Sequence, residues 1–81
     1  MRTAKELLIL MLDNMIFFRS GLCALAENLY LNDIINGEEY RSLRDLIKSN
    51  KPERTYDEEW YWKPGIKKPR VNWIKKQIET L

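Results

Sequence analysis

The sequence contains no histidine, a single cysteine and three serines among its 81 residues. Without histidine the chain lacks the commonest general base, and with one cysteine it can neither close a disulfide within itself nor supply the usual His/Cys zinc ligands. These absences exclude most familiar catalytic designs. We therefore expect a protein that binds a partner without catalysis, with no metal and no cofactor.

The sequence also lacks a hydrophobic run long enough to cross a membrane. A spanning helix needs about 20 apolar residues, whereas the longest run, Leu7–Leu12, is followed directly by Asp13 and Asn14. A cleaved export signal fits poorly as well, because Glu6, Asp13 and Arg19 interrupt the stretch that would have to be uncharged. With one thiol and no such segment, we expect a cytoplasmic protein that does not contact a membrane.

Length and composition favour one folded domain. A chain of 81 residues and 9.8 kDa has material for a single hydrophobic core. Hydrophobic residues make up 44% and charged residues 32% of the chain, a balance typical of globular proteins. No internal repeat and no low-complexity tract is present, so residues 1–81 are expected to form one domain.

A first helix is predicted to begin near Thr3. Thr3 and Glu6 have the spacing of a capping box, in which the two side chains satisfy backbone N–H groups at a helix start. The following run, Leu7–Leu12, would cover every side of a helix with apolar groups rather than one stripe. A small monomer rarely surrounds one helix completely, so we expect the chain to self-associate through this helix.

Two further helices are indicated by apolar residues at helical spacing. Gly21 and Asn36-Gly37 provide the breaks before them, and Glu38-Glu39 would place acid in a first turn, where it complements the helix dipole. Lys48 and Pro52 are typical of the end of the second of these helices. The expected apolar faces are Leu22, Leu25, Ala26 and Leu29, then Tyr40, Leu43, Leu46 and Ile47.

The periodicity is lost between Lys51 and Lys68, where Trp60–Trp62 favour an ordered aromatic loop over disorder. Pro69 suits the first turn of a last helix. Its expected inner face is Val71, Ile74, Ile78 and Leu81, with Lys75, Lys76 and Glu79 outward. The sequence thus predicts a small all-α domain of about four helices around an aromatic loop, assembled as a homo-oligomer.

Positive charge gathers in the C-terminal part. Residues 1–50 carry six basic and seven acidic side chains, and residues 51–81 carry eight basic and five acidic ones. From Trp62 to Gln77 there are six lysines or arginines and no acid. Such a distribution is typical of an end that attracts anions.

Aromatic residues share this basic stretch. A tryptophan can stack a base for about 1–3 kcal/mol, and lysine and arginine bind phosphate oxygens. Arg70, beside Pro69 at the expected helix start, could direct its guanidinium and the free N–H groups at one anion. We therefore expect a nucleotide-type ligand to bind at these residues: Trp60, Trp62, Lys63, Lys67, Lys68, Arg70 and Trp73.

One part of the chain resembles a known group of proteins. The run Tyr61-Trp62-Lys63-Pro64-Gly65, the run Lys68-Pro69-Arg70 with Trp73, and Gly21-Leu22-Cys23 upstream resemble small uncharacterised proteins encoded by phages and prophages. The resemblance extends from about Gly21 to the C-terminus. It implies a phage setting in the cytoplasm of a host cell, where small proteins often antagonise host defence. Some of them act as sponges for cyclic-nucleotide or ADP-ribose-type immune signals.

Other interpretations of these residues stay open. The tryptophans can be the core of a small domain and the lysines its solvated face. The aromatic patch can dock on a host defence enzyme, since Trp, Tyr and Arg are enriched at interaction hot spots, and the basic third can bind nucleic acid. Three further features are interpreted as structural: Asp57-Glu58-Glu59 as a solvated acidic turn, Cys23 as a small buried hydrophobe, and Arg41, Arg44 and Lys48 as a solvated basic edge.

Overall fold

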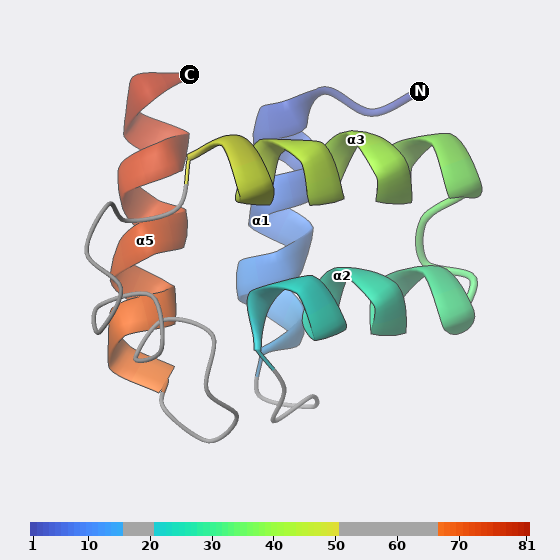
Figure 1. Ribbon diagram of the computed structural model, residues 1–81, viewed down its shortest axis with the longest axis horizontal. Coiled ribbons are helices and arrows are strands. Elements are labelled where there is room, and N and C mark those ends of the chain that lie inside the picture. The colour runs from blue at the N-terminus through green and yellow to red at the C-terminus, as the bar shows by residue number, and fades with distance from the viewer. Residues whose placement is uncertain (16–20, 51–66) are drawn as a thin grey trace.

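The computed structural model describes residues 1–15, 21–50 and 67–81, with backbone alone at 67–69. Within these ranges the chain forms four helices and no strand (Figure 1). They are α1 (Ala4–Asn14), α2 (Leu22–Leu31), α3 (Gly37–Ser49) and α5 (Lys67–Thr80). The all-α prediction is therefore confirmed for the described part of the chain.

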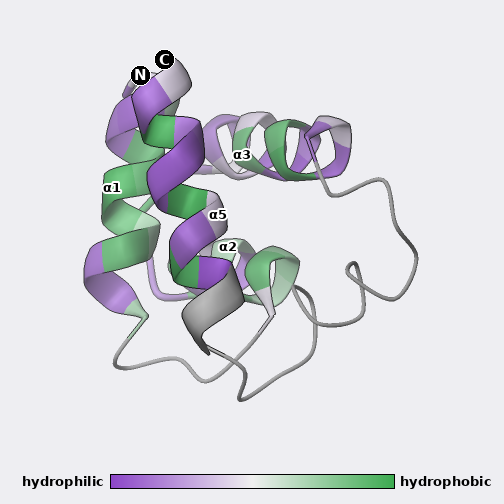
Figure 2. Ribbon diagram, turned by 90° about the vertical axis from the view of Figure 1, so that its left-hand side faces the viewer, coloured by the Kyte–Doolittle hydropathy of each residue, from purple (hydrophilic) through white to green (hydrophobic). Residues whose placement is uncertain are grey.

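Helix α1 lies at the centre of the arrangement. It packs against α2, α3 and α5, while α2 and α3 pack against each other as an antiparallel pair (Figure 1). Viewed from the α5 side, α1 is hydrophobic over its middle turns, whereas α5 alternates between hydrophobic and hydrophilic residues (Figure 2). The central position of α1 explains why its apolar residues are not confined to one stripe.

The apolar run of α1 is mostly covered by the chain's own helices. Leu7, Leu8 and Met11 are fully buried, and of the run only Ile9 is exposed, at 40%. Burial of each leucine contributes about 1.5–3 kcal/mol relative to exposure. The homo-oligomer expected through α1 stays a prediction, and the apolar surface that remains for it on this run is Ile9 with parts of Leu10 and Leu12.

The apolar faces predicted for the other helices are largely confirmed. The four residues expected on the inner face of α2 are fully buried, and α3 buries Leu43 and Ile47. In α5, Ile74 is buried and Val71 and Ile78 are half-buried, but Leu81 is 57% exposed. Leu81 follows the last helical residue, which takes it away from the face it would continue.

Capping boxes begin two of the helices. At α1 the Glu6 backbone N–H donates to the Thr3 hydroxyl and the Thr3 N–H donates to the Glu6 carboxylate, as the sequence predicted. The hydrogen bond that the Thr3 backbone N–H donates to the carboxylate is the main cause that holds the pKa of Glu6 below its usual value. At α3 the same exchange joins Asn36 and Glu39. Both helix starts thus satisfy N–H groups that have no partner within the helix.

The Glu39 carboxylate also binds the N-terminal segment. It accepts hydrogen bonds from the Arg2 backbone N–H at 3.0 Å and from Arg2 Nη1 at 3.0 and 3.2 Å. The Glu39 side chain is 3% exposed, whereas that of Arg2 is 44% exposed. The backbone N–H of Asn36 and then the groups of Arg2 hold the pKa of Glu39 below its usual value. This carboxylate therefore ties the start of α1 to the start of α3.

We predict that Glu39→Gln lowers the thermal stability at neutral pH, because an amide offers one acceptor oxygen to three donors. A depressed pKa means that the ionised carboxylate stabilises the fold above its ordinary value of 4.5, and that this contribution is lost as pH falls through the lowered pKa. The difference in melting temperature between wild type and variant should therefore shrink in acid. Circular dichroism melting curves recorded from neutral to acid pH measure this difference in melting temperature.

Glu38→Gln is the matched control, because Glu38 lies in the same first turn and is exposed. It removes the same charge at the same helix end and should leave stability nearly unchanged. Equal losses in the two variants would show that the hydrogen bonds of Glu39 contribute nothing beyond the helix dipole.

Candidate functional site

The residues predicted to bind a ligand divide into three groups. Trp60, Trp62 and Lys63 lie outside the described residues. Lys67 and Lys68, which were predicted to lie at the end of the loop, are in the first turn of α5, because the helix begins two residues before Pro69. Two of the seven, Arg70 and Trp73, are described with their side chains, and both lie on α5.

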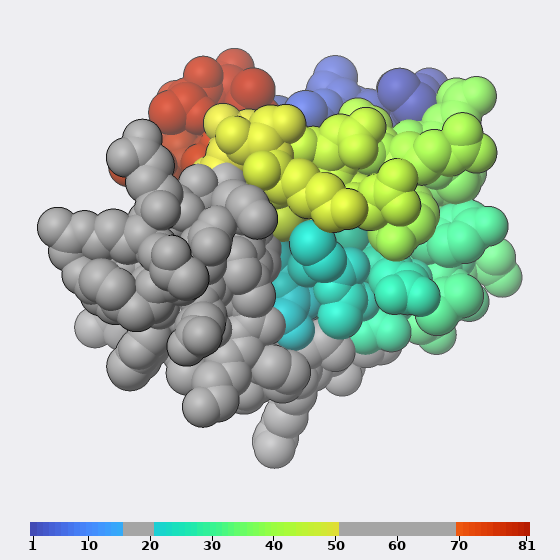
Figure 3. All heavy atoms as spheres, viewed as in Figure 1, coloured from blue at the N-terminus to red at the C-terminus, as the bar shows by residue number. Residues whose placement is uncertain are grey.

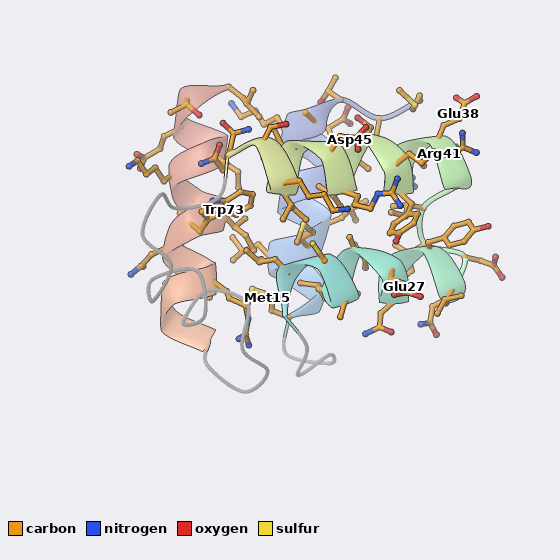
Figure 4. The ribbon with its side chains drawn as sticks, in the orientation of Figure 1. Met15, Glu27, Glu38, Arg41, Asp45 and Trp73 are labelled. Atoms are coloured by element: carbon orange, nitrogen blue, oxygen red, sulfur yellow. The ribbon has the colours of Figure 1, made fainter. Side chains whose placement is uncertain are left out.

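Arg70 and Trp73 face the interior of the fold. They are three residues apart, on one side of α5, and are 1% and 4% exposed. Trp73 Nε1 donates a hydrogen bond to the backbone carbonyl of Asn50 at 2.9 Å, which joins α5 to the end of α3 (Figure 4). For Trp73, the interpretation as a core residue is thus the one that this geometry favours.

The guanidinium of Arg70 is a buried positive charge. Burial lowers the pKa of Arg70, but an arginine side chain in a protein keeps its proton at neutral pH. Taking such a charge out of water is costly unless polar or anionic groups surround it. Arg70 thus contributes positive charge beneath the surface of α5, and a ligand could contact it only after the atoms that cover it had moved.

The charges of α5 are arranged against its own dipole. A helix N-terminus carries a partial positive charge and favours acids, and the C-terminus favours bases. The first four residues of α5 include Lys67, Lys68 and Arg70 and no acid, while its last turn contains Glu79 and no base. In α1 and α3, by contrast, the first turns contain Glu6 and Glu38-Glu39.

This reversed arrangement has an electrostatic consequence. A charge of the wrong sign at a helix end costs about 0.3–1 kcal/mol. A helix whose first turn contains basic residues and no acid favours an anion at its N-terminus, where the partial positive charge and the free N–H groups lie. The N-terminal turn of α5 is therefore the described part of the chain with the chemistry to attract an anion. Lys75 and Lys76, exposed on the same helix, lie one to two turns further on.

The basic edge predicted on α3 is only partly solvated. Arg41 and Lys48 are exposed, as expected, but Arg44 is half-buried, with its guanidinium carbon 5.6 Å from the centre of the Tyr40 ring. Tyr40 in turn stacks on Tyr30 of α2, with ring centres 5.4 Å apart and planes at 13°. The spacing of Tyr40 and Arg44, four residues apart, is the sequence signal for the first of these contacts.

Cys23 and the acidic run Asp57-Glu58-Glu59 are the candidates that remain. Cys23 is half-buried against the core rather than fully buried, and Asp57-Glu58-Glu59 lie outside the described residues. Within the described ranges no group of three or more acidic or cysteine side chains is placed to hold a metal ion. Among the described helices, none has the length and hydropathy needed to cross a bilayer.

No protein-family model, curated protein or solved structure matches this chain. The resemblance to small phage proteins therefore stays a prediction.

The burial of Arg70 leads to a prediction about stability. Arg70→Ala removes a fully buried side chain and should lower the free energy of unfolding by about 1–3 kcal/mol. Lys75→Ala removes the same charge from an exposed position of the same helix and should change it by less than about 0.5 kcal/mol. Urea unfolding measures both. Equal effects would mean that Arg70 contributes only its charge.

Proposed function

We propose that this chain is a non-catalytic binding protein that captures a nucleotide-type ligand at the N-terminal turn of α5. The observation that carries the proposal is the reversed charge of α5. Its first turn concentrates cations where a helix alone would favour acids. Proteins tolerate such local conflicts chiefly at functional sites, where a ligand compensates the lost stability.

The composition of the neighbouring sequence supports a ligand that carries both phosphate and base. No acid occurs between Trp62 and Gln77, so nothing in that stretch repels a phosphate. Trp60 and Trp62 supply flat aromatic rings, and Lys63 a further cation. Phosphate binding at a helix N-terminus and base stacking on indole are compatible in one ligand.

We assign different roles to the seven proposed site residues. Lys67 and Lys68 are proposed to bind phosphate directly, with Trp60, Trp62 and Lys63 completing the site. The buried pair is proposed to support the site from below: Arg70 by its charge, and Trp73 by its hydrogen bond to the end of α3. Arg70 is thus proposed to act on the ligand through the field of its charge.

The biological setting of the proposal comes from the resemblance to small phage proteins. In that setting the ligand is a cyclic oligonucleotide or an ADP-ribose derivative that serves as an immune signal in the host cytoplasm. Capture of such a signal is stoichiometric and requires affinity instead of turnover. A chain without histidine is suited to that task.

The proposal predicts that Lys67→Ala/Lys68→Ala weakens ligand binding and stabilises the fold. Loss of two charge-assisted contacts should reduce affinity at least about tenfold, since tenfold corresponds to 1.4 kcal/mol. Removal of two cations from the positive end of a helix should raise the free energy of unfolding by about 0.5–2 kcal/mol. Native mass spectrometry and calorimetry with cyclic dinucleotides, cyclic trinucleotides and ADP-ribose derivatives measure the binding, and urea unfolding measures the stability.

Lys75→Ala/Lys76→Ala is the matched control, because it removes two lysines from exposed positions away from the helix start. It should leave affinity within about threefold of wild type. Equal losses in the two double variants would indicate non-specific attraction by net charge. If no member of the panel binds the wild type, capture of a nucleotide is wrong, and inhibition of a host defence enzyme by direct docking becomes the better hypothesis.

Salt dependence separates this proposal from nucleic-acid binding. A duplex or single strand releases many counterions when it is bound, so its affinity falls steeply with added salt. A small nucleotide with two or three phosphates should lose no more than about tenfold in affinity between 50 and 200 mM salt. A thousandfold loss of affinity over this salt range, together with tighter binding of oligonucleotides, would indicate that the ligand is DNA or RNA and not a small nucleotide signal.

A further inference from the structure

The connection between α2 and α3 contains an asparagine followed by glycine, Asn36-Gly37. Figures 1 and 3 show this connection at the surface, at the end of the molecule away from α5, and Asn36 is exposed there. Glycine has no side chain to hinder an attack by its own backbone nitrogen. The other five asparagines of the chain precede larger residues: Met15, Leu29, Asp33, Lys51 and Trp73.

The fold does not require glycine at position 37. Gly37 is the first residue of α3, and its φ lies outside the left-handed region. A Cβ at this position would lie 3.7 Å from Cε1 of Tyr30, which is an ordinary van der Waals distance. Alanine, a better helix former, would therefore fit there. Neither packing nor backbone conformation explains why the residue after Asn36 is glycine.

The reaction open to this pair is deamidation. The backbone nitrogen of Gly37 attacks Cγ of Asn36 and gives up its proton, and the side-chain amide leaves as ammonia, which closes a succinimide ring. Water then opens the ring at either of its carbonyls. The product is an aspartate, or an isoaspartate in which the main chain runs through Cβ and Cγ. Water is the one co-reactant.

The native conformation of Asn36 does not allow this ring to close. In a planar ring, Cβ of Asn36 and the Gly37 nitrogen must lie on the same side of the Cα–C bond. At the observed φ of −89° and ψ of 176° this nitrogen is staggered relative to Cβ. The Asn36 carbonyl accepts from the Tyr40 N–H, and the Asn36 side chain accepts from the Glu39 N–H, each at 2.9 Å. Rotation about the Cα–C bond breaks this arrangement, so the reaction requires the first turn of α3 to open.

Arg2 opposes the opening of this turn from a distant part of the chain. The Glu39 carboxylate accepts from the Asn36 N–H at 3.0 Å and also from the backbone N–H and the guanidinium of Arg2. We call the bonds between Arg2 and this carboxylate the Arg2–Glu39 contact. Because the same carboxylate holds Asn36, a firm Arg2–Glu39 contact lowers the population of the open turn.

We propose that Asn36 is a modification site at which the chain deamidates, and that the Arg2–Glu39 contact controls the rate. The isoaspartate product lengthens the main chain just before α3 and converts the former Asn36 carbonyl into a free carboxylate. The capping box and the bond from Tyr40 then lose their geometry. Deamidation thus releases the N-terminal segment from α3 irreversibly. The N-terminal turn of α5 takes no part, so this proposal and the proposed ligand capture can fail separately.

The test follows deamidation of the full chain at neutral pH by peptide mapping with mass spectrometry. In wild type, Asn36 should be modified before any other asparagine. Arg2→Ala leaves the sequence around Asn36 intact and should raise the rate there about threefold or more, because it removes charged hydrogen bonds that keep the turn closed. Glu39→Gln should act in the same direction. In concentrated urea, where the turn is absent, wild type and Arg2→Ala should react at equal rates.

Three control variants keep the test specific. Glu38→Gln changes an exposed residue of the same turn that lies outside the capping box (Figure 4), and should leave the native rate unchanged. Ile74→Val lowers the global stability from the buried side of α5 and should also leave it unchanged, because the turn opens locally. Gly37→Ala hinders the attacking nitrogen and should slow the reaction severalfold in native and in unfolded chains.

The aged protein tests the release of the N-terminal segment. The isoaspartate form, isolated by chromatography, should melt at a lower temperature than the variant Asn36→Asp. The two have the same composition and differ in the path of the main chain, and aspartate is as good an N-cap residue as asparagine. Equal melting temperatures would overturn the release.

Three further results would overturn the proposal. If Asn36 is modified no faster than Asn32 in wild type, it is not the modification site. If Arg2→Ala and Glu39→Gln deamidate at the wild-type rate in the native state, the Arg2–Glu39 contact does not control the reaction. If Ile74→Val accelerates the reaction as much as Arg2→Ala does, deamidation proceeds through global unfolding instead of opening of this turn.

Discussion

The structure depends on one carboxylate, that of Glu39. It caps α3 through Asn36, and it receives both the backbone N–H and the guanidinium of Arg2, so the same group sets where α3 begins and where α1 starts. Since α1 packs against the other three described helices, its position affects its contact with each of them. A charge buried this fully is stable only while its donors stay in place.

Helix α3 is consequently held at both ends: by Glu39 to the N-terminal segment, and by the carbonyl of Asn50 to Trp73 of α5. Its own charges follow its dipole, with acids first and Lys48 last. Helix α5 has the opposite arrangement and relies on tertiary contacts instead, through Trp73 and Ile74. Helix α3 can thus support an α5 whose N-terminal turn is electrostatically unfavourable.

Local chemistry made much of this predictable. Thr3 and Glu6, the break before Gly37, and the spacing of Leu22, Leu25 and Leu29 act over a few residues, and the described helices follow them. Contacts between distant residues were not predictable in this way. Arg2 and Glu39 are 37 residues apart, and the stack of Tyr30 on Tyr40 depends on how α2 meets α3. In the candidate site Pro69 indicated the start of a helix but not that the helix begins two residues earlier, at Lys67. The burial of Arg70 follows only from the packing of α5.

The central place of α1 also bears on how the chain is made. Because synthesis proceeds from the N-terminus, Leu7, Leu8 and Met11 emerge before α5, which is one of the helices that cover them. Until then the most apolar segment of the protein has an incomplete cover and is exposed to other nascent chains. A longer delay between the synthesis of α1 and that of α5 therefore prolongs the time in which these side chains can associate with other chains.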